Sequence, residues 1–561
     1  MNAPEHRPVA APLAERFLTH RVDNQPPELA PYDPWSTDLP LREAVAREGG
    51  GWAEKDIAAF ATLSGGEMME LGRLANENKP KLRAFDRYGR RCDAVEFHPA
   101  YHRLMELAFA HGVPNFAWRH GERTGAHVAR MALAYLHNQA DQGTSCPLTM
   151  TYACVPTLRH QPELARDWLP RVSSTQYDPR VLPAAQKRGA TVGMGMTEKQ
   201  GGSDVRSNTT HAYAVGARGP GQLYELVGHK WFFSAPMCDA HLVLAYSDGG
   251  LSCFLVPYLA PDGTRNAVRI QRLKDKLGDW SNASSEVEFC GALGWMVGEE
   301  GRGVANILEM VALTRQDCMI GSASLMRQAL VQAIHHARHR RAFGKPLIEQ
   351  PLMQNVLADL ALECEAHTAL TARVARAVDA AARDAHEAAF ARIATALGKY
   401  WVCKRATPFV NEAQECLGGA GYVEDAPLAR LYRQAPLNSI WEGSGNVVCL
   451  DVLRAARREP DSVQALFAEL ATARGGHPAL DRAVEDLKRE FAAADALEAR
   501  ARALAERAAL ALQAAVLVRA GNRSVADLFC ETRLAGAHGQ AFGTLPPQAP
   551  LSALIERAFP A

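Results

Sequence analysis

Apolar residues recur every three to four positions over long parts of the chain. Before residue 170, the stretches "IAAFATLSGGEMMELGRLANE" and "AYHRLMELAFAHG" place them at i, i+3, i+4 and i+7. That spacing puts the apolar side chains on one face of a helix. We therefore expect an N-terminal helical domain over residues 51–188, behind an irregular, proline-rich arm over residues 1–50.

The pattern changes near residue 190 to short runs of β-branched and aromatic residues, separated by Gly, Pro, Asp and Asn. "LYELVGHKWFFSA", "AHLVLAYS" and "LSCFLVPYL" are examples of these runs. Such runs are typical of strands, and they predict a central β domain over residues 189–299.

Long segments rich in Ala, Leu and Arg begin near residue 301 and predict an antiparallel helical bundle over residues 300–458. The stretch "RREPDSV" breaks this pattern, and a further helical domain is expected over residues 459–561. With 561 residues, the chain is also too long for a single core. The predicted fold class is α+β and mostly helical.

Composition excludes several classes of protein. Lys+Arg and Asp+Glu both number 62, so the bulk charge predicts neither a nucleic acid nor a membrane partner. No apolar run approaches the roughly 18 residues that span a bilayer, and the N-terminal arm lacks the apolar centre of a signal peptide. The 12 cysteines show no C-x-x-C and no Cys/His ligand spacing. This favours a cytoplasmic protein without structural zinc or disulfides.

The first chemical candidate is "GMGMTEKQGGSD", residues 193–204. Position 198 is Glu where a dinucleotide-binding G-x-G-x-x-G loop has its third glycine, and no G-K-[ST] ends the stretch. An NAD or ATP site is therefore not predicted. A strand that ends at Thr197, followed by two glycines and Ser203, could present N–H groups and hydroxyls to a polar ring or a phosphate. Taken alone, the stretch is only a turn.

A second candidate is the basic stretch "HHARHRRAFGKP", residues 335–346. His335 and His339 are spaced as i and i+4, which suits a metal, but no acid or third ligand lies nearby in the sequence. No metal site is predicted. A basic cluster at the end of a helix suits the helix dipole, and it suits a pyrophosphate equally well.

A third candidate is Glu442, which stands between Trp441 and the flexible stretch Gly443–Ser444–Gly445. A solvated loop glutamate is the commonest interpretation of such a stretch. A carboxylate partly desolvated beside a tryptophan can instead hold a raised pKa and act as a base. The two glycines let the backbone approach a bound molecule closely.

Six ordered motifs resemble those of one family, the acyl-CoA dehydrogenase family of flavoproteins. They are "GMTEKQGGSD", "GHKWFFS", "VGEEGRGVANIL", "HRRAFGKPLIEQ", "LGGAGYVEDAPLARLYR" and "NSIWEGSGN". The predicted order of helical domain, β-barrel or sandwich and helical bundle is also that family's fold. Further stretches, such as "ELGRLANENKP" and "RLKDKLG", and the extra C-terminal helices resemble the branch that serves the adaptive response to DNA alkylation.

The resemblance implies an FAD cofactor. The residues it implies for flavin binding are Met194, Met196, Thr197, Ser203, Phe232, Ser234, Arg340, Phe343, Ile440, Trp441, Gly443, Ser444 and Asn446. It gives Arg340 a contact to the FAD pyrophosphate of a neighbouring subunit. It gives Glu442 the role of the base that removes the α proton of an acyl thioester. Two glutamines that hold the nucleotide across the family's dimer are Pro351 and Glu415 here, so those contacts must be made differently or lost.

The same branch implies further partners: double-stranded DNA, an acyl-CoA ligand, and copies of the chain in a homotetramer. Residues 462–561 contain eleven basic and eleven acidic residues, so their charge alone predicts an ordinary solvated surface. The candidate DNA contacts are Arg454, Arg482, Arg489, Arg500 and Arg507. Arg482 and Arg489 are seven residues apart, as are Arg500 and Arg507, so each pair shares a helix face. Weakly sequence-specific contacts to phosphates are therefore expected.

Three functions remain open from the sequence. The first is an FAD-containing, DNA-binding flavoprotein that protects DNA from alkylation and keeps weak, isovaleryl-CoA-type dehydrogenase activity. The second is a working short- or branched-chain acyl-CoA dehydrogenase whose extra domain serves assembly. The third is a DNA binder in which flavin only aids folding.

Overall fold

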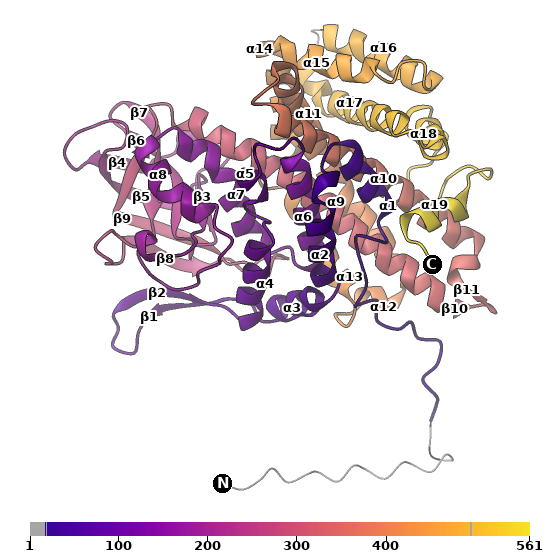
Figure 1. Cartoon of the computed structure of the whole chain (residues 1–561), viewed down its shortest axis with the longest axis horizontal. Coiled ribbons are helices and arrows are strands. Elements are labelled where there is room, and N and C mark those ends of the chain that lie inside the picture. The colour runs from indigo at the N-terminus through magenta and orange to yellow at the C-terminus, as the bar shows by residue number, and fades with distance from the viewer. Residues whose placement is uncertain (1–16, 18, 494–495) are drawn as a thin grey trace.

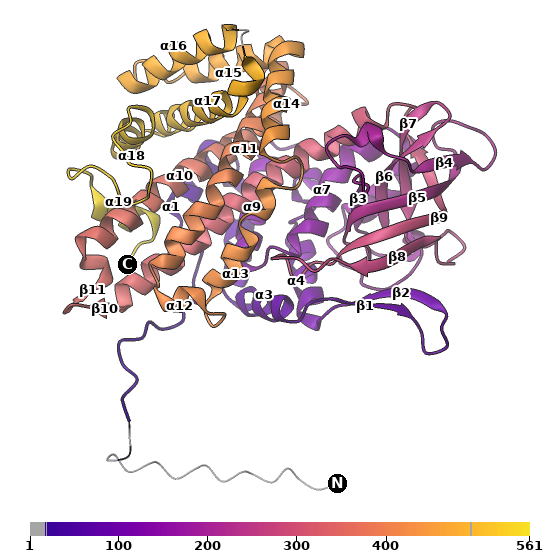
Figure 2. The ribbon, with the colours of Figure 1, turned by 180° about the vertical axis from the view of Figure 1, so that it is seen from behind.

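The computed structural model describes residues 17, 19–493 and 496–561. A body of β-strands forms one end of the molecule, long helices form the middle, and the C-terminal helices pack over the other end (Figures 1 and 2). The predicted α+β, mostly helical fold class is confirmed.

The N-terminal part is helical with one exception, and its first helix lies inside residues 1–50, which were predicted to be irregular. Its helices are α1 (Leu39–Arg47), α2 (Glu54–Ser64), α3 (Glu67–Glu77), α4 (Pro99–Ala110), α5 (Phe116–Arg119), α6 (Ala126–Ala140), α7 (Ser145–Arg159) and α8 (Pro162–Val172). Between α3 and α4 the chain forms a hairpin of β1 (Lys81–Phe85) and β2 (Arg91–Glu96). This hairpin was not predicted, although the alternating exposure along β1 has the period of a strand.

The central strands close into a barrel. They are β3 (Val192–Gly195), β4 (His211–Ala214), β5 (Leu223–Ser234), β6 (Ala240–Ser247), β7 (Gly250–Pro257), β8 (Val268–Leu273) and β9 (Ser284–Val297). The path β6–β4–β5–β9–β7 returns to β6 because β7 also pairs with β6, while β3 and β8 flank β6 and β9. Aromatic side chains such as Tyr224, Phe254 and Phe289 fill the interior.

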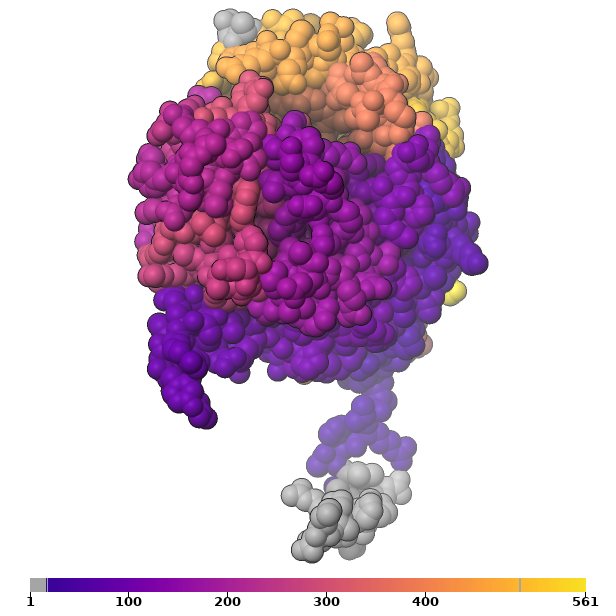
Figure 3. Space-filling view, turned by 60° about the vertical axis from the view of Figure 1, so that its left-hand side comes forward, coloured from indigo at the N-terminus to yellow at the C-terminus, as the bar shows by residue number. Residues whose placement is uncertain are grey.

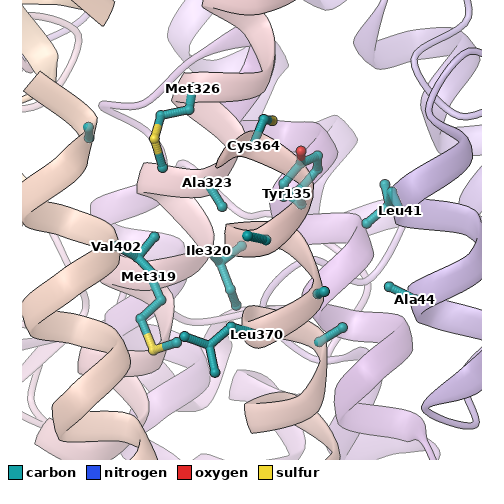
Figure 4. Close-up of a cluster of buried hydrophobic side chains, with 14 of the residues drawn as sticks. Leu41, Ala44, Tyr135, Met319, Ile320, Ala323, Met326, Cys364, Leu370 and Val402 are labelled. Carbon is teal, nitrogen blue, oxygen red and sulfur yellow. The ribbon is translucent and has the colours of Figure 1, made fainter. Parts of the chain in front are cut away.

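A bundle of long helices follows the barrel. It comprises α9 (Gly303–His339), α10 (Pro351–Ala380), α11 (Ala385–Glu415), α12 (Gly419–Tyr422), α13 (Pro427–Gln434) and α14 (Gly445–Arg458), with a short hairpin of β10 (Arg341–Ala342) and β11 (Lys345–Pro346) between α9 and α10. Figure 4 shows how Leu41 of α1, Tyr135 of α6, Ile320 of α9, Leu370 of α10 and Val402 of α11 share one core.

The last helices are α15 (Pro460–Ala471), α16 (Pro478–Ala492), α17 (Leu497–Ala520), α18 (Arg523–Phe529) and α19 (Leu551–Ala558). They are joined to the bundle by buried polar contacts as well as by apolar packing. Arg373 of α10 donates to Glu469 of α15 at 2.8 Å, and Trp401 Nε1 donates to Gln513 Oε1 at 3.1 Å. Among the described residues, no helix is both long and apolar enough to cross a bilayer.

Candidate active site

Glu442 lies in a turn just before α14 where two consecutive residues are left-handed. The φ angle is 56° at Glu442 and 101° at Gly443. A left-handed conformation costs a residue with a Cβ about 1–2 kcal/mol, so other contacts must hold it. Arg315 Nε donates to the Glu442 carbonyl at 2.9 Å, and Lys399 donates to the Gly443 carbonyl. Two cations from α9 and α11 therefore hold the backbone of this turn.

The Glu442 carboxyl group points at α9. Its Oε2 accepts a hydrogen bond from Thr314 Oγ1 at 2.7 Å. Burial raises the pKa of the Glu442 carboxyl above its ordinary value, although the Thr314 hydrogen bond and the charges of Arg315 and Lys399 oppose the rise. A carboxyl group with a raised pKa and one defined hydrogen bond is suited to take up a proton.

Asp451 of α14 binds two arginines behind the turn of Glu442. Its carboxylate accepts from Arg315 of α9 at 2.7 Å and from Arg392 of α11 at 3.0 Å. Although burial acts against it, the two arginines lower the pKa of Asp451, so this carboxylate stays ionised. Three helices thereby meet at one charged cluster directly behind the turn.

None of the four residues that hold this turn was predicted from the sequence: Thr314, Arg315, Lys399 and Asp451. The available signal was weak: "LTRQD" places four consecutive polar residues in the first half of helix α9, where Thr314 and Asp317 are buried. A buried polar residue in a long helix needs a partner, but the pattern does not say which one.

The candidate flavin residues of the barrel lie at the ends of two neighbouring strands. Thr197 follows β3, and its carbonyl accepts from the Trp231 N–H of β5 at 2.8 Å, which places it next to Phe232. At the end of β5, Ser234 Oγ lies 3.2 Å from Ser284 Oγ of β9. Met196 follows β3 directly, and its carbonyl accepts from Asn208 Nδ2 at 2.9 Å.

A shared hydrophobic cluster joins these strand ends to the turn of Glu442. Met194, Met196 and Trp441 all pack in this cluster between the barrel and the helices. Trp441 Nε1 donates to Asn438 Oδ1 at 2.8 Å, which fixes the ring. The fold thus brings Met196 and Trp441, which are 245 positions apart in the sequence, into the same hydrophobic cluster.

A buried ion pair organises the loop that carries Ser203. Lys230 Nζ lies 2.7 Å from Glu198 Oε1, and neither side chain is exposed. Glu198 also accepts from the N–H groups of Thr209 and Thr210. Burial acts against ionisation, but the charge of Lys230 prevails and lowers the pKa of Glu198 to about 2. Glu198, whose presence argued against a dinucleotide-binding loop, therefore has the structural role of holding this loop in place.

The residues at these strand ends, together with those around the turn of Glu442, fit the flavin that the resemblance implies. Phe232 and Ile440 are large apolar side chains that are 53% and 61% exposed, and they offer apolar surface to a ring. Thr197, Ser203 and Ser234 supply hydroxyl groups for its polar edge. A Cβ on Gly202 would lie 2.6 Å from Thr197 Oγ1, so only glycine allows this close turn. Ser444 precedes α14 without capping it, and Asn446 Oδ1 accepts from Arg502 at 3.4 Å.

Arg340 and Phe343 do not join this group within one chain. They lie at the far end of α9, and 25 residues of helix separate Thr314 from His339, a distance of roughly 37 Å along the axis. Figures 1 and 2 show β10 and β11 at the end of the molecule away from the barrel. Phe343 is 99% exposed. Arg340 donates to the Asn24 carbonyl at 2.6 Å.

Asn24 makes further contacts that the sequence analysis did not anticipate. Its amide donates to the Arg341 carbonyl at 2.9 Å, and its carbonyl Oδ1 accepts from the Arg341 N–H at 2.7 Å. The N-terminal arm is therefore docked on the end of α9. Nearby, Pro351 begins α10, and Glu415 ends α11, where it accepts from Asn411 at 3.1 Å.

The candidate DNA-binding arginines lie on three helices. Arg454 is on α14, Arg482 and Arg489 are on α16, and Arg500 and Arg507 are on α17. Four of them have polar partners nearby: Arg454 pairs with Asp451, Arg489 with Asp486 and Arg507 with Glu490, and Arg500 donates to the Ala493 carbonyl. Arg482 is exposed.

Sequence profiles of known domains match most of the chain. Residues 24–179 match the N-terminal domain of the adaptive response protein AidB, residues 193–291 match the acyl-CoA dehydrogenase middle domain, and residues 301–457 match the acyl-CoA dehydrogenase C-terminal domain. These matches cover the helical part, the barrel and the bundle in that order.

Individual proteins agree with these matches. AidB of Escherichia coli (strain K12) is 51% identical over 477 residues, which are 85% of this chain and 87% of that protein. Acyl-CoA dehydrogenase family member 11 of Caenorhabditis elegans is 32% identical over 71% of this chain and 66% of that protein. The crystal structure of Caenorhabditis elegans ACDH-11 in complex with C11-CoA superposes with a TM-score of 0.83 and 25% identity, covering 98% of this chain and 95% of that one.

The family resemblance seen in the sequence motifs is therefore confirmed. Domain profiles, a close relative and a full-length structural match give the same result. The chain belongs to the acyl-CoA dehydrogenase family, whose members are flavin-dependent CH–CH oxidoreductases that bind FAD.

Proposed function

We propose that this chain is an AidB-like, FAD-containing flavoprotein of the adaptive response, which binds double-stranded DNA and protects it from alkylation damage. It retains weak acyl-CoA dehydrogenase activity of the isovaleryl-CoA type. The observation that supports the flavin chemistry most directly is the hydrogen bond from Thr314 to Glu442, beside strand ends with flavin-binding motifs. The DNA-protecting role is supported by the 51% identity to AidB.

In the dehydrogenase reaction, Glu442 removes the α proton of the acyl thioester. Its raised pKa makes it a better proton acceptor than an exposed glutamate, and Thr314 orients the carboxyl group. When FAD is bound, it supplies the oxidising chemistry by accepting hydride from the β carbon. Apolar surface is supplied by Trp441, by Met194 of β3 and by Met196, which follows β3. This surface keeps water from the proton on Glu442.

The flavin assignment predicts a yellow protein that holds FAD without a covalent bond. The residues that would hold it within one chain are Met194, Met196, Thr197, Ser203, Phe232, Ser234, Ile440, Trp441, Gly443, Ser444 and Asn446. The test is the visible absorbance of the purified protein, before and after incubation with FAD. A folded preparation that shows no flavin absorbance even after reconstitution contradicts the assignment.

The proposed assembly is a homotetramer in which Arg340 serves a site in another copy, because it lies far from Glu442 of its own chain. Large apolar side chains are exposed around the same end of the molecule: Phe343 is 99% exposed, and Leu352 and Tyr422 are each 83% exposed. Sedimentation of the wild type and of Phe343→Ser tests this assembly. Tetramers that persist in the variant with unchanged stability contradict the assigned interface.

DNA binding is assigned to the C-terminal helices. Arg454, Arg482, Arg489, Arg500 and Arg507 would contact phosphates, and each contact should add about −0.9 to the slope of log affinity against log salt. Changing all five to Ala should flatten the slope by several units, equally on two unrelated duplexes, since phosphates carry no base code. Unchanged affinity and slope, with FAD and assembly intact, would place DNA binding elsewhere.

The alternative is a working short- or branched-chain acyl-CoA dehydrogenase whose extra helices serve assembly. It is favoured by the ion pairs that Arg454, Arg489 and Arg507 make with acids of the same chain. It is also favoured by the buried bond between Arg373 and Glu469, which ties the extra helices to the bundle. Rapid acyl-CoA turnover without DNA affinity would select this alternative.

A further inference from the structure

The hairpin of β1 and β2 projects from the body of the molecule on the side of the barrel (Figures 1 and 2). Figure 3 shows it from another direction as a separate projection below the barrel. Its sequence, "KLRAFDRYGRRCDAVE", has five basic and three acidic residues, whereas the whole chain has no net charge. Because the hairpin projects and carries excess positive charge, a negatively charged partner can reach it.

The base of the hairpin is anchored to the barrel. Leu82 and Val95, which pair across the two strands, pack against the barrel core. Arg91 donates to the Ile270 carbonyl of β8 at 2.5 Å, and Arg265 donates to the Asp93 carbonyl at 3.3 Å. The hairpin is therefore held in a fixed direction.

The turn at the tip is organised by Asp86. Its carboxylate accepts from the N–H groups of Tyr88 and Arg90 at 2.8 and 3.0 Å and from Arg90 Nε at 2.7 Å. Gly89 completes the turn with a φ of 79°. These bonds place Arg87 and Tyr88 at the apex and commit Asp86 to the turn itself.

The outer face carries basic and aromatic side chains together. Lys81, Arg83 and Phe85 alternate on the exposed side of β1, and Phe85 is 53% exposed. At the tip, the guanidinium groups of Arg87 and Arg90 lie over the Tyr88 ring at 4.6 and 5.1 Å, and that ring is 66% exposed.

Three of the five basic groups pair with acids of the hairpin, and two of these pairs lie at its exposed surface. Arg91 pairs with the buried Asp93 at 2.8 Å, and Arg90 pairs with Asp86 at 2.7 Å. Glu96 pairs with Arg83 at 2.9 Å, but both side chains are more than half exposed. Exposed pairs of this kind contribute about 0–1 kcal/mol, so a phosphate can replace the carboxylate at little cost.

We propose that the β1–β2 hairpin is a second contact for duplex DNA, separate from the C-terminal helices. A two-stranded ribbon has the width to enter the major groove. Arg83, Arg87 and Arg90 would bind phosphates, and Tyr88 would pack against a sugar or a base edge. This inference rests on the proposed DNA-binding function and adds to it a surface at the other end of the chain.

Nucleic acid fits this surface better than a second copy of the chain or a lipid membrane. A contact between copies gains nothing from bulk charge, because the whole chain has no net charge, whereas duplex DNA is negatively charged along its length. A membrane contact favours large aliphatic or aromatic wedges beside the basic groups, and the exposed large apolar side chains of this hairpin are the two rings of Phe85 and Tyr88, without an exposed aliphatic side chain. Planar guanidinium groups next to an aromatic ring match phosphates and base edges.

The test measures the affinity of the intact flavoprotein for a random-sequence duplex between about 50 and 200 mM salt. One variant changes Arg83, Arg87 and Arg90 to Gln. A second variant changes the same three residues to Lys and keeps the charge. A control changes Lys55, Arg119 and Arg166, which are exposed on helices of the N-terminal part, to Gln. The five-arginine variant of the C-terminal helices is titrated in parallel.

The Gln variant should lose at least tenfold in affinity and flatten the salt slope by about three units, because three phosphate contacts are removed. The Lys variant should keep the slope within about one unit. The control should match the wild type. Wild-type affinity and slope in the Gln variant, while the five-arginine variant loses both, would overturn the hairpin contact and leave the proposed function standing.

Other results also decide the matter. A wild-type protein that binds no duplex anywhere in this salt range overturns the proposed DNA-binding function, and the hairpin contact with it. A Gln variant that sediments as a smaller assembly identifies the hairpin as an interface between copies. Loss of binding to phosphatidylserine vesicles, with duplex binding unchanged, identifies it as a lipid contact. Either result overturns the inference.

Discussion

The Thr314 hydroxyl lies 2.7 Å from Glu442 Oε2 and 3.0 Å from the carbonyl oxygen of Val311. A hydroxyl group has one proton to donate and can also accept. When Glu442 is ionised, Thr314 donates to it. When Glu442 is protonated, the acid donates to Thr314, whose own proton then turns to Val311. Thr314 thus serves both protonation states that a base passes through.

Replacing Thr314 with Val should raise the pKa of Glu442 further, since the carboxylate loses the hydrogen bond from the Thr314 hydroxyl. Thr314→Ser keeps the hydroxyl and should restore the wild-type behaviour. A hydrogen bond to a charged group contributes about 1.5–3 kcal/mol, so the pH at which flavin reduction sets in should move upward in the Val variant, because Glu442 must be ionised to act as the base. The measurement is the pH dependence of acyl-CoA-dependent flavin reduction. Identical profiles in the Val and Ser variants would show that Thr314 has no part in setting the pKa.

Glu442→Gln should stabilise the protein at neutral pH. The pKa of Glu442 is raised in the folded state, so ionisation costs the folded protein free energy once the pH exceeds the unfolded pKa. Below that pH the carboxyl group is protonated in both states and the cost is absent. Thermal unfolding should therefore give a higher Tm for the variant at pH 7 and nearly equal values at pH 4. A lower Tm of the variant at pH 7 contradicts this.

Lys230→Met should destabilise the protein by about 3–5 kcal/mol, because it leaves Glu198 buried without its cation. The double variant Glu198→Gln/Lys230→Met should recover much of that loss, and Lys199→Met is the exposed control. The pKa of Glu198 is lowered to about 2, so its contribution is complete above its ordinary value and is lost as the pH falls toward about 2. Urea unfolding of the wild type, the two single variants and the double variant measures the loss of stability and its recovery. Unfolding of the wild type from pH 7 to 3 measures the pH dependence.

Asn24→Ala should release the N-terminal arm from the end of α9 and free Arg340. The substitution removes two hydrogen bonds to Arg341, and alanine disfavours the φ of 53° found at this position. If a pyrophosphate of FAD and the Asn24 carbonyl compete for Arg340, the Ala variant should bind FAD several-fold more tightly, whereas Arg340→Ala should bind it at least tenfold more weakly. The measurement is FAD affinity by fluorescence titration. Weaker binding in both variants would mean that the arm positions Arg340 instead of competing for it.

The class of each main segment was predictable because its pattern repeats over many residues. The period of α9 and α11 spans more than 30 residues in each helix, and the β-branched runs of the barrel are equally regular. The β1–β2 hairpin was missed because two short strands sit between long helices, and ten or so residues give little periodic signal.

The candidate site was predictable only where its residues stand together in the sequence. Trp441 and the following glycines drew attention to Glu442, but the resemblance of "NSIWEGSGN" to the family's motif was needed to favour a base over a solvated loop glutamate. Its partner Thr314 is 128 positions away, so no local pattern joins them. The contact between Arg340 and Asn24 spans 316 positions and likewise depends on the tertiary structure.

The central claim is that Glu442 is the base of a flavin-dependent dehydrogenase site, and anaerobic titration with isovaleryl-CoA tests it most directly. The loss of flavin absorbance is followed in the wild type and in Glu442→Gln, which keeps the shape of the side chain but cannot take a proton. The wild type should bleach slowly, and the variant, with its FAD and DNA affinity retained, should bleach at least about a hundredfold more slowly still. Bleaching of the variant at the wild-type rate, or a wild type that never bleaches with any acyl-CoA, would contradict the claim.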